Sequence, residues 1–302
     1  MHFASLTVIL SILTFLALQA AARDVPPNIQ AFYDSVKRNG SCSRVLQSGF
    51  AAKGSTAENT DILIAFSYCG SRLRDGVVYI SGERGQMADM DVDCDGTQRP
   101  RLGDDGRCGT SSDMQSMTSF RGDVGSYGRS IQDLNAFVHP YVVFGNSASR
   151  DLPGYVQYDP RGDGVHPLSV VATVCGNGKM FYGIWGDVNG DDAPKAIIGE
   201  ASISMATLCF GTDVINGGAG HDQTDVLYLA FTGKDALPGA RGAKWDAHTP
   251  EEFEESIAAL GGRLASRIGM EATVPTMTAT AALSESSSTS ATTLMTRASA
   301  AS

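Results

Sequence analysis

The chain has 302 residues, 42% of them hydrophobic, which is enough for one sizeable core or at most two small ones. Its 34 glycines and its charged content of only 19% favour a compact, turn-rich, largely β protein over a helical bundle. The net charge of −10 argues against nucleic acid as a partner, because its phosphate backbone needs a basic face, and it favours a cationic partner, with solubility alone as the alternative explanation.

The N-terminal segment has the pattern of a secretory signal. Its apolar run is short for a membrane span and ends in the small residues Ala20, Ala21 and Ala22. An uncleaved membrane anchor is the alternative, but no basic stop-transfer cluster follows. We therefore predict a secreted, extracellular protein with no membrane attachment after cleavage. Its expected parts are a signal peptide at 1–22, one folded domain at 23–271, and a disordered tail rich in Ser, Thr and Ala at 272–302.

Two helices are predicted, one on each side of a series of strands. Before Gly40, apolar residues recur at helical spacing: Ile29, Phe32, Tyr33 and Val36. Near the C-terminal end, Thr249 and Glu252 have capping-box spacing ahead of an apolar stripe. Several strand candidates are apolar on both faces, which predicts a closed or two-layered structure. These candidates are 61–69, 76–81, 140–145, 168–175, 179–185, 195–204 and 225–233.

The six cysteines are expected to form disulfides in an oxidising compartment. Six cysteines allow about fifteen pairings. Cys94 and Cys108 are close enough in sequence to close one loop. The other two candidate pairs are Cys42 with Cys69 and Cys175 with Cys209. Zinc is the weaker interpretation, because no CxxC pair occurs and the histidines are scattered.

The first acidic cluster lies in "MADMDVDCDG". Asp91, Asp93 and Asp95 match the opening of a calcium-binding loop, but Leu102 stands where the closing Glu should be. Alternatively, these three residues and Asp89 alternate with apolar residues, which is the period of a strand with one carboxylate face. Such a face repels itself unless a cation or a cationic ligand neutralises it. A solvated turn is the third interpretation.

The second acidic cluster is "DVNGDDAP", followed by an isolated glutamate. Asp187 and the two alternate residues after it match the first positions of a calcium loop. Asp192 and Ile198, however, replace the required Gly and the closing acidic residue. Two chain-reversal dipeptides, Asn-Gly and Ala-Pro, favour a turn. If that turn makes a hairpin, Asp187 pairs with Ala196 or with Glu200. Both registers place Asp187 and Glu200 on one face, whereas a one-residue shift separates them.

These two carboxylates are the minimum needed for glycoside hydrolysis. Glu200 has small or apolar neighbours, so burial there is expected to raise its proton affinity, as a general acid requires. Asp187 lies next to polar loop residues and is expected to stay ionised, as a base must. A solvent-facing strand glutamate is the alternative interpretation of Glu200.

The third cluster is "GHDQTD", ahead of an apolar strand. His221, Asp222 and Asp225 are candidate substrate contacts, although Asp222 and Thr224 can instead shape a turn. No Gly-x-Ser-x-Gly elbow, P-loop or paired-histidine motif occurs, so serine, phosphoryl and zinc chemistry have little support.

Three stretches resemble the fungal endo-chitosanases of glycoside hydrolase family 75: "DMDVDCDG", "MFYGIWGDVNGDDAPKAIIGEASISMATLCFG" and "GHDQTDVLYLAF". The resemblance covers about residues 27 to 235. It implies internal, inverting hydrolysis of β-1,4-linked glucosamine polymers without a metal or other cofactor, with Asp187 and Glu200 as the essential pair. The Ser/Thr-rich tail departs from the short family core.

The resemblance also names a cationic partner, chitosan, which an acidic cleft attracts. We expect a monomer in which six aspartates contribute to substrate binding: Asp89, Asp91, Asp93, Asp95, Asp222 and Asp225. The expected fold is a single mainly β (α+β) catalytic domain with a small β-barrel and flanking helices. A six-stranded double-psi barrel is the leading candidate. The rival function is a non-catalytic secreted carbohydrate-binding or calcium-stabilised cell-wall protein.

Overall fold

The computed structural model describes residues 23–40, 42–52, 66–112, 114–129, 131–150, 152–191 and 195–269. The predicted signal peptide, the predicted tail and the first part of the strand expected at 61–69 lie outside these residues. None of the helices in the described ranges is long and apolar enough to cross a membrane.

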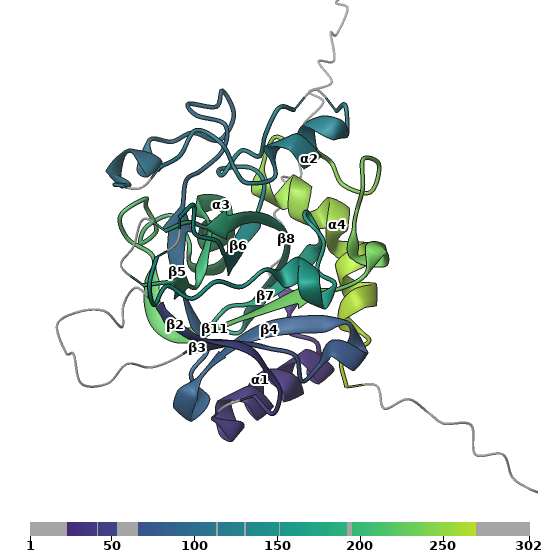
Figure 1. The fold of residues 1–302 in the computed structure, drawn as a ribbon. Coiled ribbons are helices and arrows are strands. Elements are labelled where there is room, and N and C mark those ends of the chain that lie inside the picture. The colour runs from purple at the N-terminus through teal and green to yellow at the C-terminus, as the bar shows by residue number, and fades with distance from the viewer. Residues whose placement is uncertain are drawn as a thin grey trace, which may run out of the picture. The chain divides into compact units, whose positions relative to one another are not determined.

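Figure 1 shows strands at the centre of the fold and helices around them. The strands are β1 (Arg23–Asp24), β2 (Val45–Ala52), β3 (Phe66–Cys69), β4 (Val77–Gly82), β5 (Ala88–Asp93), β6 (Tyr141–Asn146), β7 (Val170–Val174), β8 (Lys179–Asn189), β9 (Ile197–Ile198), β10 (Glu200–Ser202) and β11 (His221–Phe231). The α-helices are α1 (Pro27–Asn39), α2 (Arg121–Ser126), α3 (Ile203–Phe210) and α4 (Pro250–Ala265). Short 3-10 turns lie at Leu73–Asp75, Glu83–Gly85, Arg107–Thr110, Pro160–Asp163 and Lys234–Ala236.

Six strands close into a barrel in the order β6, β8, β7, β11, β5, β10 and back to β6. The β6–β8 and β5–β10 pairs are parallel, and the other four are antiparallel. Strands β4, β3, β2 and β9 extend the sheet from β11. The prediction of a mainly β fold with a small barrel and flanking helices is confirmed, and so is the number of barrel strands.

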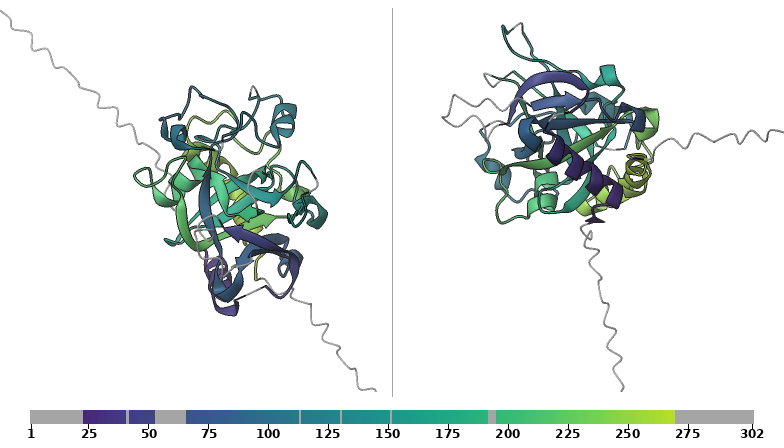
Figure 2. Two further views of the ribbon diagram at one scale, coloured as in Figure 1. Left: turned by 60° about the vertical axis from the view of Figure 1, so that its left-hand side comes forward. Right: turned by 90° about the horizontal axis from the view of Figure 1, so that it is seen from below.

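The barrel is covered on its outside, which explains why its strands are apolar on both faces. Every residue of β5, β6 and β7 is buried. Helix α4 packs against β7 and β8, and α3 packs against β5 and β8. Helix α1, in purple in Figure 2, lies beside the strands that extend the barrel, where Phe32 contacts Tyr79 edge-on with ring centroids 5.0 Å apart.

The two predicted helices are confirmed. In α1 the four residues of the predicted stripe are buried, and Gly40 ends the helix in a left-handed conformation at φ 70°. At α4 the Thr249 side chain accepts a hydrogen bond from the Glu252 N–H at 3.3 Å, which caps the first turn. Gly261, which weakens the helix by propensity, has a packing reason: a Cβ there would overlap the ring of Tyr182 on β8.

All three candidate disulfides are present. Cys42 pairs with Cys69, Cys94 with Cys108 and Cys175 with Cys209, with Cα separations of 5.9, 5.9 and 5.7 Å. The second bond closes the loop after β5, and the third joins the end of β7 to α3. The zinc alternative is wrong for these cysteines, because all six are bonded to one another.

The strand predicted at 195–204 is present only in part, as β9 and β10, and the hairpin with β8 that the turn allowed does not form. Gly199, at φ 90°, separates β9 from β10, and a Cβ there would overlap the carboxylate of Asp89. The chain then turns into α3, because the Ser202 side chain accepts from the Met205 N–H at 3.2 Å and caps that helix. Strand β6 lies between β8 and β10, so the two do not pair.

Candidate active site

Two cross-strand pairings place Asp187 and Glu200 on one face of the barrel sheet. Val143 on β6 lies opposite Glu200 of β10 on one side and opposite Asp187 of β8 on the other. Directly opposed residues in neighbouring strands project from the same face. The two carboxylates therefore flank Val143 with one strand between them. The predicted shared face is present, although it arises through β6 and not through a hairpin.

A β-bulge in β8 directs the Asp187 side chain. Val142 pairs with Trp185 while the next residue, Val143, pairs with Asp187, so Gly186 is one extra residue in β8. Any Cβ at Gly186 would lie 2.5 Å from that of Tyr141 on the neighbouring strand. Because of the bulge, Trp185 and Asp187 point to opposite faces although they are two residues apart.

The Asp187 carboxylate is 5% exposed and its two oxygens differ in their contacts. Oδ1 accepts hydrogen bonds from the Ser119 N–H at 2.9 Å, the Ser119 hydroxyl at 2.5 Å and the Val188 N–H at 2.8 Å. Oδ2 is buried and has no hydrogen-bond partner among the described residues. The peptide carbonyl of Asp187 accepts from the Trp185 indole at 2.8 Å, so the backbone is held as well.

Burial raises the pKa of Asp187 to about 6, and the hydrogen bonds from Ser119 and Val188 oppose that rise. Glu200 is only half-buried. The expectation that Asp187 is the more solvated of the two is therefore wrong. Its polar neighbours in sequence do not solvate it, because the bulge at Gly186 turns its side chain into the fold.

Strand β5 carries Asp89, Asp91 and Asp93 on one face and Asp95 follows its end, so the strand interpretation is confirmed for these three residues and the solvated turn is wrong. Glu200 pairs with Asp91, and Ser202 with Asp93, in the parallel β5–β10 ladder. All four aspartates are buried, with exposed fractions of 1% for Asp89, 8% for Asp91, 5% for Asp93 and 9% for Asp95. A row of buried carboxylates thus runs along β5 beside Glu200.

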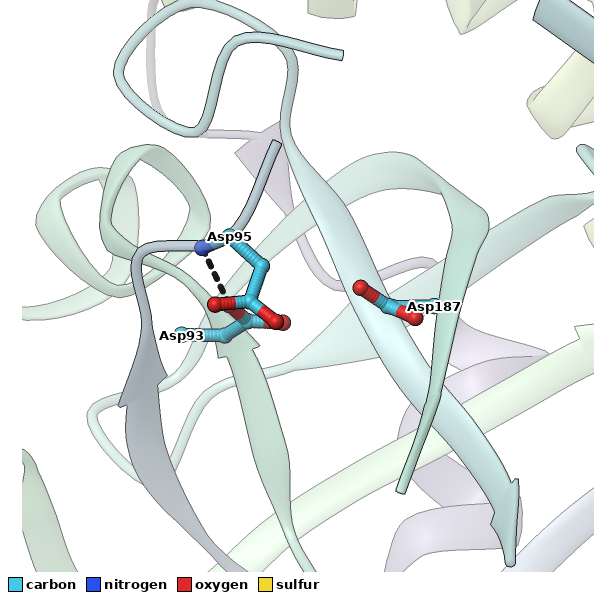
Figure 3. Close-up of side chains that lie close together, drawn as sticks. All are labelled: Asp93, Asp95 and Asp187. Carbon is cyan, nitrogen blue, oxygen red and sulfur yellow. Dashed lines mark hydrogen bonds between the residues drawn. The ribbon is translucent and has the colours of Figure 1, made fainter. Parts of the chain in front are cut away.

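The far end of that row meets Asp187 in a narrow crevice of about 20 Å³. Its lining residues are Asp93, Asp95, Gln115, Val143, Asp187, Val188, Asn189, Gly190 and Glu200. Figure 3 shows Asp93 and Asp95 beside one another at the end of β5, with Asp187 facing them from β8. Asp93 accepts from the Asp95 N–H at 2.6 Å, and Asp95 accepts from the Gln115 N–H at 2.5 Å.

The crevice has the charge and spacing to receive a cation. One oxygen from each of Asp93, Asp95 and Asp187 lies within 4.8 Å of the others. Burial raises the pKa of Asp93 well above 3.8, and the charges of Glu200, Asp187 and Asp95 raise it further. A metal ion or the ammonium group of a ligand would relieve this repulsion equally, so the spacing alone does not identify a metal site.

In its described residues the structure has two larger hollows, one that adjoins the crevice and one that shares no lining residue with it. One of about 460 Å³ shares Val188 with the crevice and is lined by Ser119, Phe120, Tyr158 and Trp185 among others, which extends the site beyond Asp187. Another of about 550 Å³ is lined by Arg129, Arg241 and Lys244. Its basic lining does not suit a cationic ligand, and it contains neither Asp187 nor Glu200.

The other two predicted site residues, Asp222 and Asp225, do not line the crevice. Asp222 is exposed on β11, and Asp225 Oδ1 lies 2.7 Å from His221 Nε2. The His221 ring stacks on Phe210 with centroids 3.9 Å apart. His221 pairs with Met90, whose side chain alternates with those of Asp89 and Asp91. His221 therefore lies on the opposite face of β5 from these aspartates.

Sequence reasoning missed the loop residues that complete the site. Ser119 reaches Asp187 across 68 residues, and Gln115 reaches Asp95 across 20. The Tyr141 hydroxyl, which donates to the Asp95 carbonyl at 3.1 Å, was also missed. Nothing in the local pattern around any of the three signals these contacts, which depend on how the loop after β5 folds back over the barrel.

A small barrel that presents a carboxylate pair beside an acidic crevice fits the class of the glycoside hydrolases. Comparison with known proteins agrees: the family model described as "Fungal chitosanase of glycosyl hydrolase group 75" matches residues 90–267. An endo-chitosanase from Aspergillus oryzae (strain ATCC 42149 / RIB 40) is 44% identical over 264 residues, which are 87% of this chain and 98% of that protein. An endo-chitosanase from Aspergillus fumigatus is 43% identical over 245 residues, 81% of this chain and 92% of its own. The chain belongs to the group 75 family of fungal chitosanases.

Proposed function

We propose that the protein is a secreted endo-chitosanase that hydrolyses β-1,4 bonds between glucosamine residues with inversion, using Asp187 and Glu200 as its acid and base. The observation that carries this proposal is the row Glu200–Val143–Asp187, which puts two carboxylates on one face with one strand between them. The three disulfides support secretion, because such bonds persist in oxidising compartments.

The separation across one intervening strand favours inversion. Neighbouring strands lie about 4.8 Å apart, so the Cα atoms of Asp187 and Glu200 are roughly 9.6 Å apart. Inverting enzymes hold their two carboxyl groups about 6.5–9.5 Å apart to leave room for a water, whereas retaining enzymes hold theirs about 5–5.5 Å apart. A Cα separation of this size lies nearer to the inverting range than to the retaining one.

Asp187 is the general acid in this proposal and Glu200 the base. With a pKa of about 6, Asp187 keeps its proton in mildly acidic solution. Its Oδ1 accepts from three donors, so the proton resides on Oδ2, which has no hydrogen-bond partner among the described residues. The half-buried Glu200 activates a water on the other side of the sugar. These roles reverse those expected from the sequence, because the observed burial of the two residues is reversed.

The crevice supplies recognition of the cationic polymer. Asp93 and Asp95 meet the ammonium group of a glucosamine unit, and Asp89 and Asp91 add negative charge behind them. Binding of an ammonium group offsets the mutual repulsion of these carboxylates, which a neutral sugar cannot do. The proposed mechanism needs no metal or other cofactor, a single chain supplies the pair, and the net charge of −10 argues against nucleic acid as a partner.

The test measures release of reducing ends from chitosan, with and without a chelator, for the wild type, Asp187→Asn and Glu200→Gln. Each variant is expected to lose activity on the order of 10²–10⁴-fold, because each removes one proton-transfer step. Asp213→Asn, an exposed carboxylate, is the matched control and should be fully active. An inactive wild type refutes the enzyme, and full activity in either folded variant refutes the pair. Loss of activity to the chelator would instead indicate a bound metal.

A further inference from the structure

A three-residue segment ahead of α2, Thr118–Phe120, grips Asp187 through contacts of three kinds. Its central residue, Ser119, gives both its N–H and its hydroxyl to the same carboxylate oxygen, at 2.9 and 2.5 Å. Charge-assisted hydrogen bonds of this kind are shorter and stronger than neutral ones. In the described residues, the remaining donor to that carboxylate is the N–H of Val188, the residue next to it in the chain.

The preceding residue, Thr118, anchors the segment to a second buried aspartate. Asp133, 5% exposed, accepts from the Thr118 N–H at 3.0 Å and from the Thr118 hydroxyl at 2.6 Å. It also accepts from the Leu134 N–H at 2.8 Å. These three hydrogen bonds fix the position of the Asp133 carboxylate. Because two of them come from Thr118, they also fix the backbone at Thr118 and hence the position of the next residue, Ser119.

The following residue, Phe120, contacts Asp187 indirectly, through the side chain of Trp185. Its ring packs edge-on against the indole of Trp185, with centroids 4.8 Å apart. That indole donates to the peptide carbonyl of Asp187 at 2.8 Å. The segment therefore reaches both the carboxylate and the backbone of Asp187. None of the three residues lies on a strand of the barrel.

We propose that Thr118–Phe120 is a positioning device that orients the Asp187 carboxylate and sets how firmly its proton is held, with Ser119 as the contact that does so and Thr118 as its anchor. The inference rests on the proposed function of Asp187. The paired oxygen Oδ1 is fixed by Ser119, which leaves Oδ2 as the oxygen that carries the proton. A carboxyl free to rotate would present either oxygen to the substrate.

Four other carboxylates face Asp187 and act in one direction, and the neighbouring Tyr141 phenol carries no positive charge to oppose them. Asp93 and Asp95 face it from the end of β5, Glu200 from β10, and Asp133 from beneath the segment. Each is a carboxylate, so each favours the protonated form of Asp187. The hydrogen bonds from Ser119 favour the ionised form. Ser119 thus opposes the rise in the Asp187 pKa that the neighbouring carboxylates cause, so loss of the Ser119 hydroxyl should raise that pKa.

The experiment is the pH dependence of kcat for chitosan hydrolysis in wild type, Ser119→Ala and Ser119→Thr. Loss of the hydroxyl in Ser119→Ala removes a hydrogen bond that stabilises the ionised carboxylate, so Asp187 keeps its proton to a higher pH. For a general acid, the alkaline limb then moves up by about one pH unit, and kcat falls about tenfold with little change in KM. Ser119→Thr keeps a hydroxyl and should restore the wild-type limb. Thr118→Val, which removes the anchor's hydroxyl, should give a smaller shift of the same sign.

Ser266→Ala is the control, because Ser266 is exposed after α4, its hydroxyl donates to the Arg263 carbonyl at 2.8 Å, and it lines neither the crevice nor the adjoining hollow. An unmoved limb in folded Ser119→Ala, or no restoration by Ser119→Thr, overturns the inference while an active wild type leaves the proposed function standing. A shift of the acidic limb supports the positioning role and contradicts Asp187 as the acid. If Ser119→Ala does not fold, Thr118→Val carries the test, with an unmoved limb overturning the inference. An inactive wild type refutes the proposed function itself.

Discussion

Individual carboxylates in the crevice lower the stability of the fold at neutral pH. Asp93 is 5% exposed and sits among Glu200, Asp187 and Asp95. Its pKa in the folded protein lies well above 3.8, so the folded state binds this proton more tightly than the unfolded chain does. Stability from this group is fully present below about pH 3.8 and is lost as the pH rises through the folded value.

Asp93→Asn should therefore stabilise the protein at pH 7 and much less at pH 3.5. The amide keeps the shape and the acceptor for the Asp95 N–H without the charge. A rise in Tm of a few degrees is expected at pH 7, because about 1 kcal/mol moves the midpoint of a domain of this size by roughly 2–4 °C. Thermal unfolding at the two pH values checks this, with the exposed Asp213→Asn as the control. An equal change at both pH values would contradict the electrostatic origin.

At the same scale, the sequence offered the acidic strand face as an interpretation, whereas the surroundings of the carboxylates were not predicted. Period-two alternation in "DMDVD" indicated one acidic strand face, beside a calcium loop and a solvated turn as alternatives. The burial of Asp187 was not predictable, because it depends on a bulge at Gly186 that exists only where β8 meets Tyr141 on β6. Ser119 was not predictable either, since its partner lies 68 residues away.

Secondary-structure elements were predictable where a local signal defines their ends. Thr249 caps α4 and Gly40 ends α1, and both helices form where their apolar stripes predict. The strand expected at 195–204 failed because two local features interrupt it. Gly199 breaks the strand, and Ser202 caps the helix that replaces its last residues.

The two adjacent glycines in α4 offer a test at this scale. A methyl group at Gly261 would meet the ring of Tyr182, whereas at Gly262 nothing lies within 4 Å. Gly261→Ala should therefore push α4 away from β8 and lower stability by about 1–3 kcal/mol. Gly262→Ala should raise it by up to about 1 kcal/mol through helix propensity. Urea unfolding of both variants checks the opposite signs, and stabilisation by both would show that the Tyr182 contact is loose.

For the molecule as a whole, the closed barrel brings together carboxylates that are far apart in the sequence. Asp93, Asp187 and Glu200 come from β5, β8 and β10, and they meet because these strands lie around one ring. Strands that are apolar on both faces predicted a closed or two-layered structure, and six barrel strands were the leading candidate. The order of strands around the ring was not predictable, because it is set by long-range pairings that no local pattern encodes.

The most direct test of the central claim is the anomeric configuration of the first products, followed by proton NMR during hydrolysis of chitosan by the wild type. A carboxylate pair with one strand between its members leaves room for water to attack from the face opposite the leaving group. We predict that the α-anomer appears first and converts to the β-anomer only later, by mutarotation. Initial release of the β-anomer would contradict the account of Asp187 and Glu200 as an inverting pair.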